Sequence, residues 1–184
     1  MKNSIYFIII FLVFMGGCFV QKNEYPDVTI AQVLQDLKWD YSFDTVKNIL
    51  EKKYGLKYSQ EINQDKHSSN YKEHEFLGGS FIGIKTDRWI PTFLRDSLYV
   101  VIIKVLPETA EQKAKILSTI NNNICNSPYQ KFSKIKNEWI LSENEKAICK
   151  LHINIFEKEM FISFCTDKDL SRDPNYLIPY NKNK

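Results

Sequence analysis

The side chains in this sequence that could bind a metal are few, because only three histidines are present. His74 stands between Glu73 and Glu75. His67 and Asp65 lie a few residues upstream, so a surface metal site can be considered. In an extended strand, however, the two glutamates point away from His74, and too few ligands converge to hold an ion. We therefore interpret these residues as polar loop side chains and expect no metal site.

Nucleophilic chemistry would need a cysteine beside a histidine. The pairing that we expect for the last two strands places Cys165 opposite His152. Nothing in the sequence supplies the positive surroundings that would activate the thiol. His152 lies between lysine and asparagine on the polar face of its strand, where we expect it to be exposed. We therefore name no catalytic residue.

The common signatures of cofactor-binding proteins and hydrolases are missing from the sequence. Beyond residue 17 the only glycines are Gly55, Gly78, Gly79 and Gly83, so no GxxxxGK or GxGxxG loop exists. There is also no HExxH and no GxSxG. The 25 basic and 22 acidic residues nearly balance, without a basic run. We expect no cofactor and no nucleic-acid partner.

One stretch suggests a surface that binds a protein partner. TDRWIPTFLRDS, residues 86–97, contains Arg88, Trp89, Phe93 and Arg95, and we interpret it as a long hairpin loop. Aromatic and arginine side chains dominate binding hot spots, and loops on a rigid sheet often carry them. These four residues are our candidate partner-binding loop. The alternative, which we favour, is that Trp89 and Phe93 fold back and cap the core.

The first 20 residues, MKNSIYFIIIFLVFMGGCFV, have the layout of a secretory signal, with Lys2 before an unbroken apolar stretch. The apolar stretch is shorter than the roughly 20 residues that a membrane-spanning helix needs. We therefore interpret residues 1–17 as a cleaved signal, residues 18–28 as a tether and residues 29–184 as a single α+β domain.

Met15-Gly16-Gly17-Cys18 resembles the lipobox of bacterial lipoproteins, with methionine where leucine is usual. This resemblance implies cleavage before Cys18, a diacylglycerol on the Cys18 sulfur and an acylated amino terminus. Phe19 follows, rather than the aspartate that resembles an inner-membrane retention signal, so we expect the outer membrane. The alternative is an ordinary cleaved signal with an incidental cysteine.

With Cys18 acylated, Cys125, Cys149 and Cys165 remain, an odd number for an oxidising compartment. Alternation in KAICKLHINIF puts Cys149 on the buried face of its strand, and the expected register puts Cys165 on the other face. Cys125 ends the helix that should cover the buried face. We therefore predict a disulfide between Cys125 and Cys149.

The elements that must position these residues alternate between helices and strands. Helical spacing and caps predict helices over 29–37, from about 43 to 54, and over 107–125. Residues 59–72 read as a loop or frayed strand, and 97–107 as a strand in the middle of a sheet. The last third reads as strands, with Phe156 opposite Phe161 in the final hairpin.

This order predicts an α+β fold, with helices packed on one face of an antiparallel sheet and a hint of a duplicated helix-plus-hairpin unit. It distantly resembles, in element order only, the small modules of outer-membrane assembly lipoproteins and of secreted β-lactamase inhibitor proteins. We favour a non-enzymatic, lipid-anchored envelope protein that binds a protein partner, as an assembly accessory or an immunity or inhibitor protein. The alternative is a small envelope hydrolase or carbohydrate-binding domain.

Overall fold

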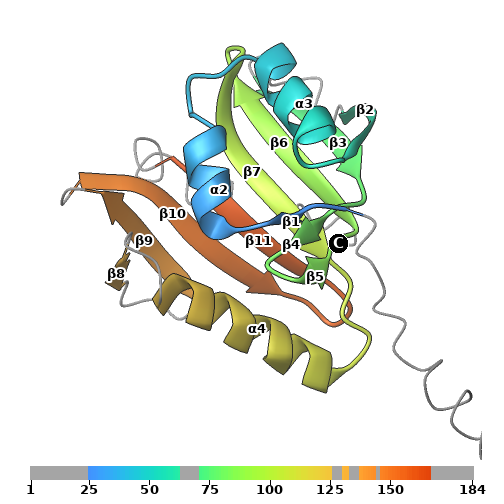
Figure 1. Cartoon of the computed structure of the whole chain (residues 1–184), viewed down its shortest axis with the longest axis vertical. Helices are drawn as coiled ribbons and strands as arrows, with labels where there is room; N and C mark the ends of the chain where they lie inside the picture. Colours follow the sequence, from blue (N-terminus) through green and yellow to red (C-terminus); the bar gives the residue numbers. More distant parts are fainter. Residues whose placement is uncertain (1–24, 63–70, 126–129, 133–136, 144–145, 167–184) are drawn as a thin grey trace, which may run out of the picture.

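The computed structural model describes residues 25–62, 71–125, 130–132, 137–143 and 146–166 (Figure 1). The expected signal, Cys18 and most of the expected tether lie outside these residues, as do Asp65 and His67. The described part is a mixed α+β structure in which strands predominate.

The three helices form where the apolar spacing and the caps predict them. They are α2 (Ile30–Asp36), α3 (Phe43–Lys52) and α4 (Ala110–Cys125). Thr29 begins α2 with a capping box: its hydroxyl accepts a hydrogen bond from the Gln32 amide (3.2 Å), and the Gln32 side chain accepts one from the Thr29 amide (2.8 Å). After α3, Gly55 has a φ of +71°, a conformation that glycine adopts readily.

Eight antiparallel strands form the main sheet, in the order β2-β3-β6-β7-β11-β10-β9-β8. Their bounds are β2 Lys57–Ile62, β3 Tyr71–Leu77, β6 Arg88–Leu94, β7 Ser97–Val105, β8 Gln130–Phe132, β9 Glu138–Glu143, β10 Lys146–Ile155 and β11 Met160–Cys165. Strand β7 lies in the middle, as predicted for 97–107, and pairs with β11. A small second sheet contains β1 (Asp27–Val28), β4 (Ser80–Phe81) and β5 (Ile84–Lys85).

Alternation along the strands separates the two faces of the main sheet. Val101, Ile103 and Val105 of β7 are buried in one large core cluster. The same cluster contains buried residues of α2, α3 and α4, among them Val33, Leu50 and Ile120. We call the face of the sheet that carries Val101, Ile103 and Val105 the core face. The side chains between these positions, such as Lys104, lie on what we call the second face.

Residues 59–72, which we read as a loop or a frayed strand, contribute to two strands, and residues 88–94, which we placed in a long hairpin loop, form a strand. Residues 59–62 belong to β2 and 71–72 to β3, while 88–94 form β6 in the body of the sheet. The β6–β7 hairpin closes through Arg95 and Asp96, which both have a positive φ. This is the geometry of a two-residue hairpin turn, which usually carries Asn-Gly or Asp-Gly. Without that signal, the turn was misread as part of a long loop.

The final hairpin has a different register from the predicted one. Ile155 is opposite Met160, so the pairing is shifted by two residues. A shift of two preserves the faces. Cys149 therefore lies in the core cluster and Cys165 in a smaller cluster on the second face, as we expected. The side chain of Cys125 lies outside the described residues, so the disulfide stays a prediction.

Candidate binding face of the sheet

The second face of the sheet carries a row of paired residues near one end of the strands. Across β3, β6, β7 and β11 the row reads Leu77, Arg88, Lys104 and Phe161. Strand alternation puts all four on the face that does not pack against the core cluster. The row thus combines two cations with two large apolar side chains.

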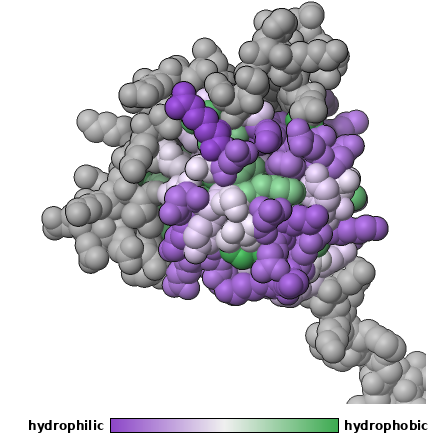
Figure 2. Space-filling view, turned by 90° about the horizontal axis from the view of Figure 1, so that it is seen from above, coloured by the Kyte–Doolittle hydropathy of each residue, from purple (hydrophilic) through white to green (hydrophobic). Residues whose placement is uncertain are grey.

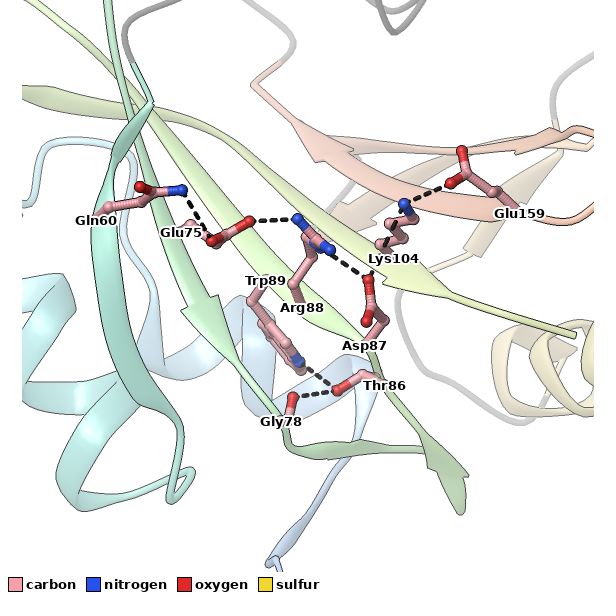
Figure 3. Close-up of polar contacts among 9 residues, drawn as sticks. All are labelled: Gln60, Glu75, Gly78, Thr86, Asp87, Arg88, Trp89, Lys104 and Glu159. Carbon is pink, nitrogen blue, oxygen red and sulfur yellow. Dashed lines mark hydrogen bonds and ion pairs between the residues drawn. The ribbon is translucent and has the colours of Figure 1, made fainter.

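A continuous chain of polar contacts runs along this row (Figure 3). Its members, which we call the polar chain, are Gln60, Glu75, Arg88, Asp87, Lys104 and Glu159. Arg88 is at the centre: its η nitrogen donates to Glu75, and its ε nitrogen donates to Asp87 over 2.7 Å. Gln60 donates to the other oxygen of Glu75 over 3.4 Å. The guanidinium therefore joins carboxylates from two sides.

Lys104 continues the polar chain toward the last hairpin. Its ammonium lies 2.5 Å from the Glu159 carboxylate and 4.0 Å from that of Asp87. It also lies 5.6 Å from the centroid of the Phe161 ring, a cation–π arrangement. The side chain is thus held by partners on three sides.

The charges in the polar chain are fixed and partly shielded from water. The exposed fraction of the side chain is 7% for Glu75, 15% for Lys104, 34% for Arg88 and 40% for Glu159. The pKa of Arg88 is raised, first by the hydrogen bond to Asp87. Three carboxylates meet two cations, which leaves one excess negative charge. Such a rigid pattern of charges is suited to recognising a partner of complementary charge.

The buried residues beneath the polar chain fix the start of β6. The Trp89 indole donates to the Thr86 hydroxyl over 3.0 Å, and that hydroxyl donates to the Gly78 carbonyl over 2.5 Å. Gly79 has a φ of +97°, and a Cβ atom there would clash with a Leu56 methyl. These contacts join the ends of β3 and β6 and so hold Arg88 and Asp87 in place.

The predicted partner-binding loop does not exist as one surface. Trp89 and Phe93 are 0% and 1% exposed, because they point from β6 into the core. The alternative that they belong to the core is confirmed. Arg88 lies in the polar chain, whereas Arg95 is exposed in the turn at the other end of β6. Sequence reasoning therefore found one residue of the polar chain and missed its carboxylate partners.

His74 is a buried aromatic residue of β3, not the polar loop residue that we predicted. Its ring stacks on Phe43 with 3.8 Å between centroids, and its δ nitrogen lies 3.4 Å from the Tyr58 hydroxyl. Within the described ranges, no three His, Cys, Asp or Glu side chains are grouped as metal ligands. Burial lowers the pKa of His74, so the ring favours its neutral form.

Cys165 lies opposite Lys150, and it is Ser163 that faces His152. The Cys165 thiol is buried, and burial raises its pKa to about 12. A thiol with such a pKa is protonated at neutral pH and is a poor nucleophile. Among the described residues, the δ nitrogen of His152 is buried without a hydrogen-bond partner. The pair therefore lacks the activation that nucleophilic catalysis needs.

A shallow cleft of about 450 Å³ lies between the β4–β5 hairpin and α4. Its apolar lining includes Ile82, Ile84, Leu106 and Ile116, and Lys85 and Lys115 stand among its polar residues. None of the residues that line it is aromatic. The lining thus lacks the aromatic platform on which a sugar ring could pack.

His74 makes the stability of the protein depend on pH. A histidine whose folded-state pKa lies below its ordinary value of about 6.5 binds fewer protons when folded, so the free energy of unfolding falls as the pH drops below that value. His74→Phe keeps a ring against Phe43 and removes the titration. We expect the urea concentration at the unfolding midpoint to be lower at about pH 5 than at about pH 7.5 in the wild type. The same decrease should be smaller in the variant. Equal falls in both proteins would contradict this assignment.

Comparisons of this chain with protein-family models, with curated proteins and with solved structures give no match. In the part of the chain that the structure describes, no helix has the length and apolar character to cross a membrane. The function must therefore be argued from the geometry and from the amino-terminal sequence.

Proposed function

We propose that this protein is a lipid-anchored protein of the bacterial cell envelope, without enzymatic activity, that binds a protein partner through the polar chain. It would act as an assembly accessory or as an immunity or inhibitor protein. The anchor is the expected diacylglycerol on Cys18, and Phe19 favours the outer membrane. The observation that carries the binding role is the polar chain itself.

The polar chain resembles a prepared interface more than a reaction centre. Arg88 and Lys104 are both bonded to carboxylates, so neither cation is left to bind a substrate anion alone. Leu77, in the same row, is 40% exposed and supplies apolar area beside the charges, whereas Phe161 is buried next to Lys104. Fixed charges next to apolar side chains give affinity from the apolar area and specificity from the charges.

The alternative function, a small envelope hydrolase or carbohydrate-binding domain, would need a different kind of site. Among the described residues, the cleft beside α4 is a candidate, and its lining supplies no aromatic platform for a sugar. The Cys165 thiol is protonated at neutral pH. We therefore favour the binding role.

We also propose that the three helices cover one face of the sheet and that the fold is a duplicated unit. The first part is supported by the shared core cluster of α2, α3, α4 and one side of β7. In Figure 1, α2 and α3 lie in front of the sheet, and α4 runs along its lower border. The second is supported by the strand order. Helix α3 precedes β2, β3, β6 and β7, α4 precedes β8 to β11, and the last strands of the two sets pair at the centre.

Reversing charges in the polar chain tests the binding role. Lys104→Glu and Glu159→Lys each place like charges together, whereas the double variant Lys104→Glu/Glu159→Lys restores an opposite-charge pair. We expect the double variant to regain most of the thermal stability that either single variant loses, because the internal pair is rebuilt. We expect none of the three variants to retain the partner, because the pattern of charges that the partner meets is changed.

The readout is crosslinked co-purification from detergent-solubilised envelopes, with thermal melts of each variant. Lys52→Glu is the matched control, since Lys52 is an exposed lysine at the end of α3. A partner that is recovered with the wild type and Lys52→Glu, and lost with the stable double variant, supports the proposal. A partner that the double variant recovers in full would show that the polar chain has only a structural role.

A further inference from the structure

The large apolar side chains that are exposed in the described part of the chain all lie at one end of the sheet. They are Leu77, Leu106, Ile155 and Phe156, with exposed fractions of 40%, 50%, 40% and 39%. Leu77 ends β3, Leu106 follows β7, and Ile155 ends β10, three strands that run in the same direction. Phe156 follows directly in the β10–β11 turn. We call this set the apolar end.

The chain that leads from Cys18 joins the body at this same end. A Cβ atom on Gly78, the residue after Leu77, would lie 2.9 Å from the ring of Tyr25. Asp27 then accepts hydrogen bonds from the Ser80 hydroxyl and the Gly83 amide, both over 2.7 Å. The first described residues are thus fixed beside the end of β3.

The short tether keeps the apolar end near the membrane. Tyr25 lies seven positions after Cys18, and an extended chain covers at most about 3.5 Å per position, or about 25 Å in all. The strands from β3 to β10 are four strand spacings apart, about 19 Å. The length of the extended tether is therefore similar to the width of the apolar end. A tether of this length limits how far the folded body can rotate away from the bilayer.

The chemistry of the apolar end fits the interface of a bilayer. Leucine, isoleucine and phenylalanine side chains stand beside exposed charged residues of both signs, namely Lys57, Lys85, Lys158, Glu108 and Glu157. The turn is held in place, because the Lys113 ammonium donates to the Phe156 carbonyl over 3.0 Å and the Phe156 ring packs edge-on against Phe161. Apolar side chains on a fixed turn, with charged side chains around them that can stay in water, suit a surface that enters the headgroup region.

The opposite end of the sheet differs in character. There the β6–β7 turn presents Arg95, Asp96 and Ser97, which are all exposed. Seen from above, most of the described surface is hydrophilic, with a smaller hydrophobic area in the middle (Figure 2). The contrast gives the body a direction, with its apolar end on the side of the expected anchor.

We propose that the apolar end rests on the lipid bilayer, with Leu77, Leu106, Ile155 and Phe156 entering the headgroup region. This inference deepens the proposed function and rests on the lipid anchor at Cys18. It also places the polar chain, which includes residues of the same row as Leu77, close to the membrane surface. The expected protein partner is thus met next to the bilayer.

Tryptophan reporters at the two ends test this orientation. The acylated full chain is placed in phosphatidylcholine vesicles with and without bromine on the acyl chains, and the fluorescence of the three native tryptophans is subtracted using the wild type. We expect bromolipid to quench the added tryptophan in Phe156→Trp and in Leu77→Trp, and to leave that of Ser97→Trp unquenched. Quenching that is equal at both ends, or missing from the apolar end, would overturn the proposal.

A second experiment tests the orientation of the body independently of the lipid on Cys18. The intact mass of the isolated chain reports acylation directly. A chain that starts at Phe19 behind a hexahistidine tag is attached to nickel-chelating lipid, so the orientation is measured even when Cys18 carries no lipid. Unquenched reporters at the apolar end, together with a dimer in light scattering, would assign this surface to a second copy of the chain and overturn the proposal.

Discussion

Trp89→Ala should destabilise the fold by about 3–5 kcal/mol, the usual cost of removing a fully buried large aromatic side chain. Trp89 is 0% exposed, and its ring lies 5.7 Å from that of Tyr54 and 6.0 Å from that of Phe81. The substitution leaves a cavity between these rings and removes the hydrogen bond to Thr86. Urea unfolding followed by circular dichroism measures the loss.

Trp89→Phe is the matched control, because it keeps an aromatic ring and loses the indole donor. We expect a cost of about 1 kcal/mol from the missing hydrogen bond and a smaller loss of packing. A Trp89→Ala protein that is as stable as the wild type but no longer retains a partner would contradict the placement of Trp89 in the core. Such a result is expected of an exposed residue that contacts the partner. Both variants are therefore compared in unfolding and in co-purification.

The alternation of side chains could be read from the sequence, and the partners of each strand could not. The strand at 97–107 was predicted from its continuous apolar run, and the two faces of KAICKLHINIF from period-two alternation, and both patterns are local. The register of the last hairpin was wrong by two residues because apolar side chains match in either register. The central pairing of β7 with β11 joins residues that are between 55 positions (Val105 and Met160) and 65 positions (Val100 and Cys165) apart, and no local pattern encodes it.

The polar chain was missed for the same reason. Arg88 drew attention by its type and by its neighbour Trp89, yet both were placed in a loop. Glu75, Lys104 and Glu159 are ordinary charged residues whose importance depends on which strands are neighbours. A charged residue inside an apolar strand, as Lys104 is in SLYVVIIKVLP, was the one available signal, because such a charge needs a partner.

Cys18→Ala should abolish acyl labelling of the protein and release it from the membrane fraction. The expected modification attaches several acyl chains, and each buried methylene adds about 0.8 kcal/mol, so the anchor far exceeds the marginal binding of a single chain. Metabolic labelling with a fatty acid and fractionation of the envelope measure the two effects. Cys165→Ala is the control, since this thiol is buried in the sheet and should not be acylated.

Retention of the Cys18→Ala protein on the membrane without acyl label would contradict the lipoprotein assignment. The apolar end would not retain the Cys18→Ala protein on the membrane by itself. Its four side chains are already about half shielded by the body and offer far less apolar area than several acyl chains. The two features therefore have different roles in the proposed protein. In the proposed orientation the lipid on Cys18 would supply the affinity for the membrane, and the apolar end would turn this end of the sheet, with the polar chain that crosses it, toward the bilayer.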